Sequence, residues 1–187
     1  MTVEEIFNAL ANQMIEGLMI HSQLSDYYGF LGLLGYAKCH RYHYFEENRN
    51  YRAISDYYLL HYNKIIESTP IPNPSIIPTT WFSHKRTDVT PQTRKASIQA
   101  GFDKWVNWET DTKKKYEMLY QELINLDEVA SALEVAKLIK DVDEELAEAD
   151  QKRLEQIAND YNISDIINLQ DELEQTYLTK LGELELC

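Results

Sequence analysis

The chain has 187 residues, of which 44% are hydrophobic and 26% are charged, and its formal net charge at pH 7 is −13. This length favours a single domain with a substantial core, and the composition excludes a disordered chain. The negative charge excludes nucleic acids and anionic membranes as expected partners, because binding them requires clustered Lys and Arg side chains.

The first predicted helix covers residues 3–35. Glycine and proline are scarce along the whole chain, with 6 and 5 residues respectively, and this scarcity favours long helices. Apolar residues and one histidine recur every three or four positions on a single face: Leu10, Met14, Gly17, His21, Leu24, Tyr28 and Leu31. This face is typical of a helix in a bundle.

The second helix is predicted within residues 36–68, and its start stays open between Gly35 and a turn in the polar cluster 46–50. From Tyr51 onward one face is clear and contains Ile54, Tyr58, His61 and Ile65. If residues 36–50 are also helical, one further face gathers three polar side chains, which we interpret as exposed to solvent: His40, His43 and Glu47.

All five prolines lie within residues 68–91, which show no helical periodicity. A loop of this length in a small domain needs a reason. The simplest reason is a crossover along a helical bundle, so that the helices before and after it run parallel. Thr90 and Pro91 then begin the third helix, since proline is favoured at the first helical position.

Three more helices complete a single predicted domain covering 1–187, at residues 92–125, 128–160 and 164–182. A short turn near residue 126 makes the third and fourth helices antiparallel neighbours. The predicted inner face of the fourth helix contains Val129, Ala132, Ala136, Ile139, Asp143 and Leu146. The fold class is therefore all-α, with four long helices and a short fifth.

One polar residue interrupts each of the four apolar faces: His21, His61, Glu109 and Asp143. Burying a lone charge is costly, so such residues need partners. Two imidazoles and two carboxylates that meet in a bundle would form a site for iron, manganese or zinc. The alternatives are structural: histidines that donate to backbone carbonyls, Glu109 accepting from a tyrosine or tryptophan, and Asp143 at the rim beside Lys140.

The spacing of these residues favours the two carboxylates. Glu109 lies 17 residues before the turn near residue 126 and Asp143 lies 17 residues after it, so both sit at one height on antiparallel helices. His21 and His61 share a height only if the first turn is centred near residue 41. The available turn positions agree poorly with that requirement.

The two cysteines, Cys39 and Cys187, form neither a zinc-binding spacing nor a disulfide framework. The acidic N-terminal segment does not resemble a signal peptide, and the apolar run 15–34 carries too many polar residues to span a membrane. We therefore expect a cytoplasmic protein. Apolar residues outside the predicted core faces (Met19, Phe30, Leu33 and Leu59) predict a homo-oligomer.

Three segments resemble the ferritin-like superfamily: DYYGFLGLLGY at 26–36, FDKWVNWETDTKKKYEML from residue 102, and LIKDVDEELAEAD at 138–150. The resemblance implies a ferritin-like four-helix bundle with a long crossover between helices 2 and 3 and a short C-terminal fifth helix. It also implies metal ligands at Glu109, Asp143 and Asp26, with His61 as the counterpart on the second helix. Periodicity instead turns His21 inward on the first helix, so His21 and Asp26 stay as alternatives.

The Glu-x-x-His motif of that superfamily is missing from the second and fourth helices. The resemblance therefore implies a bundle that binds iron or manganese between its helices, with weak or lost ferroxidase activity. The competing hypothesis is a non-enzymatic helical protein that contains no metal and binds another protein through its acidic, tyrosine-rich surface.

Overall fold

In the computed structural model, residues 1–67, 90–160 and 162–184 are described, and every regular element within them is an α-helix. The helices are α1 (Val3–Phe30), α2 (Leu34–Tyr62), α3 (Pro91–Asn125), α4 (Val129–Ala158) and α5 (Ile163–Leu184). The expected all-α class and the fifth helix are confirmed. Most of the predicted crossover, residues 68–89, lies outside the described part of the chain.

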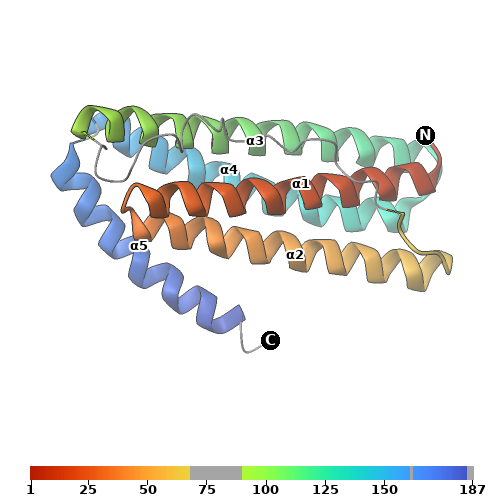
Figure 1. The fold of residues 1–187 in the computed structure, drawn as a ribbon. Coiled ribbons are helices and arrows are strands. Elements are labelled where there is room, and N and C mark those ends of the chain that lie inside the picture. Colours follow the sequence, from red (N-terminus) through yellow and green to blue (C-terminus); the bar gives the residue numbers. More distant parts are fainter. Residues whose placement is uncertain (68–89, 161, 185–187) are drawn as a thin grey trace.

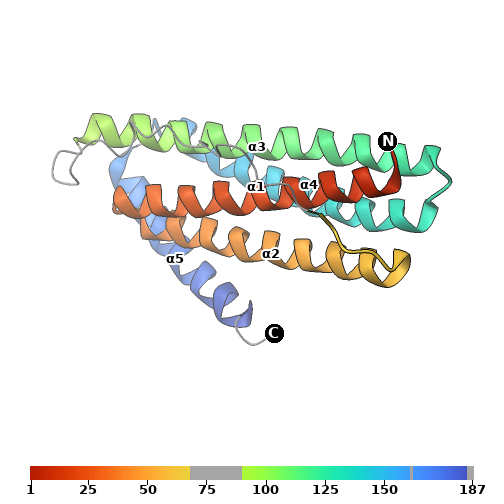
Figure 2. The same cartoon turned by 45° about the vertical axis from the view of Figure 1, so that its right-hand side comes forward.

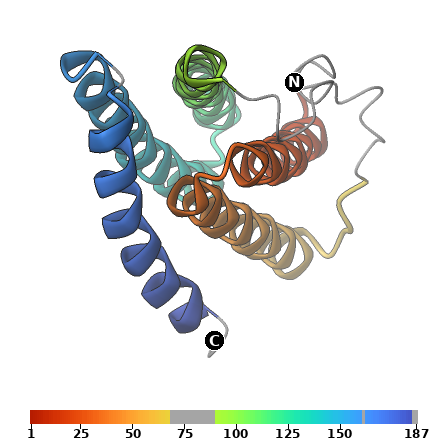
Figure 3. The ribbon, with the colours of Figure 1, turned by 60° about the vertical axis from the view of Figure 1, so that its left-hand side comes forward.

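The four long helices form two antiparallel hairpins, α1 with α2 and α3 with α4 (Figure 1). Figures 1 and 2 show α2 and α3 running in the same direction, which is what a crossover between them requires. The fifth helix leaves the end of α4 and packs across the outside of α2 (Figure 3). No helix among the described residues is long and apolar enough to cross a membrane.

The first hairpin turns at residues 31–33, and not at either predicted position. Gly32 has a φ of 77°, a left-handed conformation that glycine adopts without strain. The turn closes when the Leu33 amide donates to the Tyr28 carbonyl at 2.9 Å. The polar cluster 46–50 continues α2 because it contains neither glycine nor proline to stop it.

The second hairpin turns around Asp127, which has a φ of 59°. The amide of Glu128 donates to the Leu123 carbonyl at 2.9 Å and closes this turn. The centre of the turn is therefore one residue later than the position used to match Glu109 with Asp143. A shift of one residue in the turn changes which side chain of α4 faces α3.

Apolar side chains form two clusters along the bundle. One cluster lies where α5 packs against the end of α1, the start of α2 and the first half of α3. It includes Leu33, which was predicted to lie outside the core faces. The other fills the opposite end between α1, α2, α3 and α4, and includes Phe7 and Tyr58. Between the two clusters lies a layer of buried polar residues, and this layer is the candidate site.

The contact between α2 and α5 depends on Gly35. A Cβ atom at this position would overlap the backbone carbonyl of Gln170, and neither backbone can rotate away as a side chain can. We expect Gly35→Ala to destabilise the protein by about 1–3 kcal/mol through overpacking. Gly182→Ala is the matched control on α5, because a Cβ there meets nothing within 4 Å. Urea unfolding of both variants measures the difference, and equal midpoints would contradict the α2–α5 packing.

Candidate metal centre

Six ionisable side chains from all four long helices meet in the polar layer: His21, His40, His43, Glu47, Glu109 and Glu145. The first five are each at most 6% exposed, and the side chain of Glu145 is 13% exposed. Burial of so many charged or chargeable groups is costly unless protons or a cation compensate them.

The positions of the two turns explain why these residues meet. His21 lies 11 residues before Gly32 and His43 lies 11 residues after it, so the two rings share a height on the first hairpin. Glu109 and Glu145 lie 18 residues on either side of Asp127 and share a height on the second hairpin. The two pairs face each other across the bundle.

His21, Glu109 and Glu145 form the first group of possible metal ligands. Each offers one atom, and these three atoms lie within 4.8 Å of one another. The distance from His21 Nε2 to Glu109 Oε1 is 3.4 Å, and the indole of Trp105 donates to the same Glu109 oxygen at 3.1 Å. Trp105 therefore holds the Glu109 carboxylate, through the hydrogen bond from a tryptophan that the structural alternative expected.

His21 is neutral in the metal-free protein. Burial, aided by repulsion from His43, lowers its pKa from 6.5 to about 3. The contact between His21 and Glu109 is therefore not an ion pair at neutral pH. Nδ1 of His21 lies 3.1 Å from Nδ1 of His40, so one of the two rings donates to the other. When His21 donates, its Nε2 carries a lone pair that faces Glu109.

His43, Glu46 and Glu145 form a second group with the same 4.8 Å limit, so Glu145 belongs to both groups. Nδ1 of His43 lies 3.1 Å from Glu46 and 3.3 Å from Glu145. Burial alone lowers the pKa of His43, but the charge of Glu145 and contacts with Cys39 and Glu46 outweigh it and raise the pKa overall. This ring therefore compensates part of the negative charge.

The carboxyl groups of the layer hold protons more tightly than usual. Burial raises the pKa of Glu109 from 4.5 to about 7, against the opposing effects of His43 and Trp105. Burial also raises the pKa of Glu47, and the charges of Glu145 and Glu109 add to that rise. Glu47 packs against Gly17, where a Cβ atom would overlap its carboxylate. A cation placed between these groups would replace the protons they hold.

The layer opens to solvent between α2 and α4. A surface cavity of about 260 Å³ reaches His43, Glu46 and Glu145. Its outer wall carries three more acidic residues and two basic ones: Asp141, Glu144, Glu148, Arg49 and Lys180. A cation can therefore reach the second group of ligands from the surface.

The hydrogen bonding of the layer fits a metal ion. His21 Nε2, His43 Nδ1 and Glu145 Oε2 are buried, and none makes a hydrogen bond of regular geometry within the described part of the chain. Buried polar atoms are almost always paired. Nitrogen and carboxylate oxygen donors are also the ligands that iron and manganese accept.

Three residues proposed as ligands from the sequence lie outside this layer. Asp143 is exposed and pairs with Lys113 at 2.5 Å, because the inner face of α4 runs through Val142 and Glu145 instead. His61 is exposed near the end of α2, stacked on Tyr57, because the turn at Gly32 puts His43 opposite His21. Asp26 is exposed on α1.

The structure brings together His21 and Glu109 and adds residues that the sequence analysis did not place in the site. His40, His43 and Glu47 were interpreted as a solvated face of α2, but all three are buried. Their spacing placed all three residues on one helical face. Three ionisable residues on one face are consistent with either an exposed surface or a buried site, so the spacing alone did not decide between them. Glu145 could not be recognised as a site residue from the sequence, because it is one of several neighbouring acidic residues on α4.

Glu109 gives the metal-free protein a distinct dependence on pH. Between pH 4.5 and 7 the folded protein keeps a proton that the unfolded chain has released, so stability falls as pH rises. We expect the native protein to lose about 2 kcal/mol more than Glu109→Gln between pH 5 and pH 7. Urea unfolding in the presence of a chelator measures this loss. If the free energies of unfolding of the two proteins change equally with pH, the pKa of Glu109 is not raised and the prediction is wrong.

No protein-family model and no curated protein sequence matches the chain. Solved structures do match. A ferritin from Archaeoglobus fulgidus, engineered into a closed form, has a TM-score of 0.76 at 16% identity, over 93% of this chain and 96% of that one. The open-pore ferritin of the same hyperthermophilic archaeon has a TM-score of 0.75 at 16% identity, over 91% and 94%. A humanized archaeal ferritin has a TM-score of 0.76 at 17% identity, over 93% and 97%. The chain therefore has the predicted ferritin-like fold.

Proposed function

We propose that this protein binds iron(II) or manganese(II) ions within the bundle, at two adjacent positions. His21 and Glu109 hold one ion, His43 and Glu46 hold the other, and Glu145 is shared between them. The observation that carries this proposal is a set of three buried atoms that make no hydrogen bond of regular geometry to the described residues: His21 Nε2, His43 Nδ1 and Glu145 Oε2. Each belongs to a group of three possible ligands; the first group comes from α1, α3 and α4, and the second from α2 and α4.

The donor atoms favour iron or manganese. Both positions offer imidazole nitrogen and carboxylate oxygen without sulfur. The ferritin-like fold supports iron by analogy, since the structural neighbours are ferritins. In place of Glu-x-x-His, α2 presents His43-x-x-Glu46, which supplies the same two ligand types three residues apart in the reverse order.

The protein's own residues prepare the site. When Nδ1 of His21 donates to His40, Nε2 of His21 keeps its lone pair for an ion, and the indole of Trp105 holds Glu109. Because the pKa of Glu109 is about 7, binding an ion near neutral pH releases a proton from part of the population. Bound iron would supply redox chemistry with oxygen, and we expect ferroxidase activity to be weak because the usual ligand motif is missing.

Two matched variants test metal binding. In the native protein, Mn(II) is expected to raise the melting temperature, because a ligand that binds only the folded state stabilises it. Glu109→Ala should lose the part of this rise that comes from the first position, because Glu109 belongs only to the group with His21 and Glu145. Asp143→Ala should keep it, because Asp143 lies at the surface of α4 and pairs with Lys113. If Mn(II) and Fe(II) under anaerobic conditions shift none of the three proteins, the layer is structural and the metal-free interaction protein replaces this proposal.

We also propose that the protein forms a homo-oligomer and is cytoplasmic. Large apolar side chains are exposed at the end of the bundle that holds the α3–α4 turn: Leu59, Leu60, Ile65, Met118, Val129 and Leu133. Leu60 is 85% exposed and Ile65 is 80% exposed, which is costly for a monomer in water. Light scattering tests self-association, and a monomer at micromolar concentration would contradict it.

A further inference from the structure

We propose a separate, sulfur-containing metal site formed by Cys39, His43 and Glu148, which takes a zinc-like divalent ion. The site uses neither His21 nor Glu109, so it can be tested independently of the first iron or manganese position proposed above. Its only link to the proposed function is His43, which also belongs to the second position.

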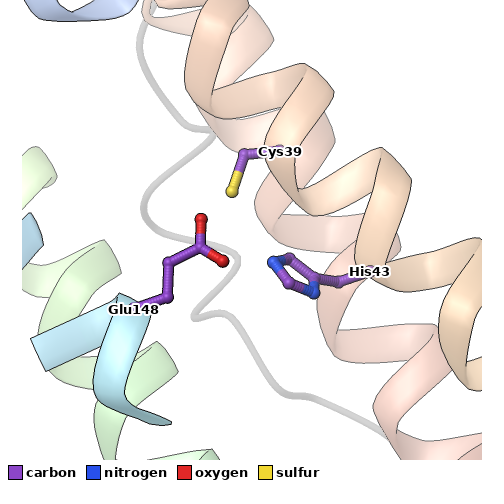
Figure 4. A group of neighbouring side chains, drawn as sticks. All are labelled: Cys39, His43 and Glu148. Carbon is purple, nitrogen blue, oxygen red and sulfur yellow. The ribbon is translucent and has the colours of Figure 1, made fainter. Parts of the chain in front are cut away.

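The three side chains come from two helices and point into one space. Cys39 and His43 are four residues apart on α2 and therefore lie on one face of that helix. Glu148 reaches toward them from α4 (Figure 4). The sulfur, one imidazole nitrogen and one carboxylate oxygen all lie within 4.8 Å of one another.

His43 supplies an independent observation that points to a ligand. It is only 2% exposed, and neither of its ring nitrogens makes a regular hydrogen bond to the described residues. Nδ1 faces Glu46 and Glu145, so Nε2 lies across the ring from them. Figure 4 shows the ring directed at the space between Cys39 and Glu148. Cys39 is fully buried at 0% exposure.

Glu148 is held in place as a charged ligand. Its Oε1 accepts from the ammonium of Lys152 and from the hydroxyl of Tyr177 on α5, which leaves Oε2 for an ion. Tyr177 is 1% exposed, so α5 covers the site.

Thiolate, imidazole and carboxylate are all ligands of zinc, and three of them leave a fourth position open. In a tetrahedral zinc site the ligand atoms lie roughly 3.3–3.8 Å apart, so ligand atoms that start within 4.8 Å of one another need to close by at most about 1.5 Å. On binding, the thiol of Cys39 releases its proton to solvent and the sulfur–metal bond forms without any change of oxidation state. Sulfur makes this site softer than the carboxylate-rich centre beside it.

A neutral imidazole has one lone pair, so His43 can serve only one of the two positions at a time. When Nε2 binds zinc, Nδ1 carries the proton and donates toward Glu46 or Glu145, as the second nitrogen of a zinc-bound histidine usually does. The second iron or manganese position then loses its imidazole. Zinc-like ions therefore compete with the second position and leave the first one intact.

Cobalt(II) tests the site directly, because a cobalt–thiolate bond gives a charge-transfer absorption that nitrogen and oxygen ligands do not. Every protein in the test carries Cys187→Ser, so that Cys39 is the only thiol in the chain. We expect one equivalent of cobalt to produce the absorption in this background. Zinc should then displace cobalt and remove the absorption.

Variants separate this site from the neighbouring centre. Cys39→Ser and Cys39→Ala should both lose the absorption, with circular dichroism showing that the helices persist. Glu109→Gln should keep it. No absorption in the Cys187→Ser background, absorption that persists without Cys39, or its loss in Glu109→Gln would each overturn the proposal. If the Mn(II) test fails while the cobalt result holds, the sulfur site stands and the proposed function fails.

Discussion

We expect the Glu145→Gln variant to bind no iron or manganese, and the native protein to bind two ions. Glu145 belongs to both groups of possible ligands. Its Oε2 lies 3.3 Å from Nδ1 of His43 in the second group, and it shares the first group with His21 and Glu109. A glutamine keeps the size of the side chain but removes the negative charge that both positions share. Removing Glu46 instead affects only one group, so Glu46→Gln should reduce binding from two ions to one.

The loss should also appear in stability. At a free Mn(II) concentration of 100 times Kd, a single site stabilises the folded protein by about 2.7 kcal/mol, and Glu145→Gln should show none of this gain. Glu144→Gln is the matched control, because Glu144 neighbours Glu145 but is exposed and pairs with Lys140 at 2.8 Å. Equilibrium dialysis gives the ratio of metal to protein. Two ions bound by Glu145→Gln would remove Glu145 from the centre.

Trp105→Ala is expected to be the most destabilising single substitution in the layer, at about 3–5 kcal/mol. Trp105 is 0% exposed and packs against the rings of His40 and His43, with centroids 4.7 and 5.3 Å away. Its loss would open a cavity beside the site and remove the donor to Glu109. Urea unfolding in the presence of a chelator measures the cost.

Trp105→Phe separates the hydrogen bond from the packing. Phenylalanine fills most of the space but has no N–H group, so the cost should fall to about 1–3 kcal/mol, the range for an unpaired buried polar group. The indole hydrogen bond lowers the pKa of Glu109, so the pKa should rise above about 7 in this variant. An equal loss of stability in the alanine and phenylalanine variants would show that packing alone accounts for Trp105.

The sequence was sufficient to predict the fold because long-range order here follows from local patterns. Scarce glycine and proline, apolar residues at helical spacing and one proline-rich connection predict four long helices and a parallel pair across the crossover. The inward positions of His21 and Glu109 followed from the same periodicity, since both lie in line with large apolar residues.

The partners of these two residues could not be predicted because they depend on turn positions. Moving the second turn from residue 126 to Asp127 replaces Asp143 with Glu145, and moving the first turn to Gly32 replaces His61 with His43. Three glycines lie close together at 29, 32 and 35, and only the folded backbone shows that Gly32 makes the turn. Gly35 serves the contact with Gln170 instead.

The face of α2 that carries His40, His43 and Glu47 was misjudged for a different reason. Ionisable residues on one helical face usually lie in water, and nothing within α2 shows that α3, α4 and α5 cover this face. Burial of such a face is a tertiary property. Trp105 from α3 and Tyr177 from α5 both pack against the His43 ring and cover it.

Anomalous diffraction from crystals grown with Mn(II) or Fe(II) tests the central claim most directly. We expect a metal peak bounded by His21, Glu109 and Glu145, with a second peak beside His43 and Glu46. Peaks only at exposed carboxylates such as Asp143, or hydrogen-bonded water between His21 and Glu145 in metal-soaked crystals, would contradict it.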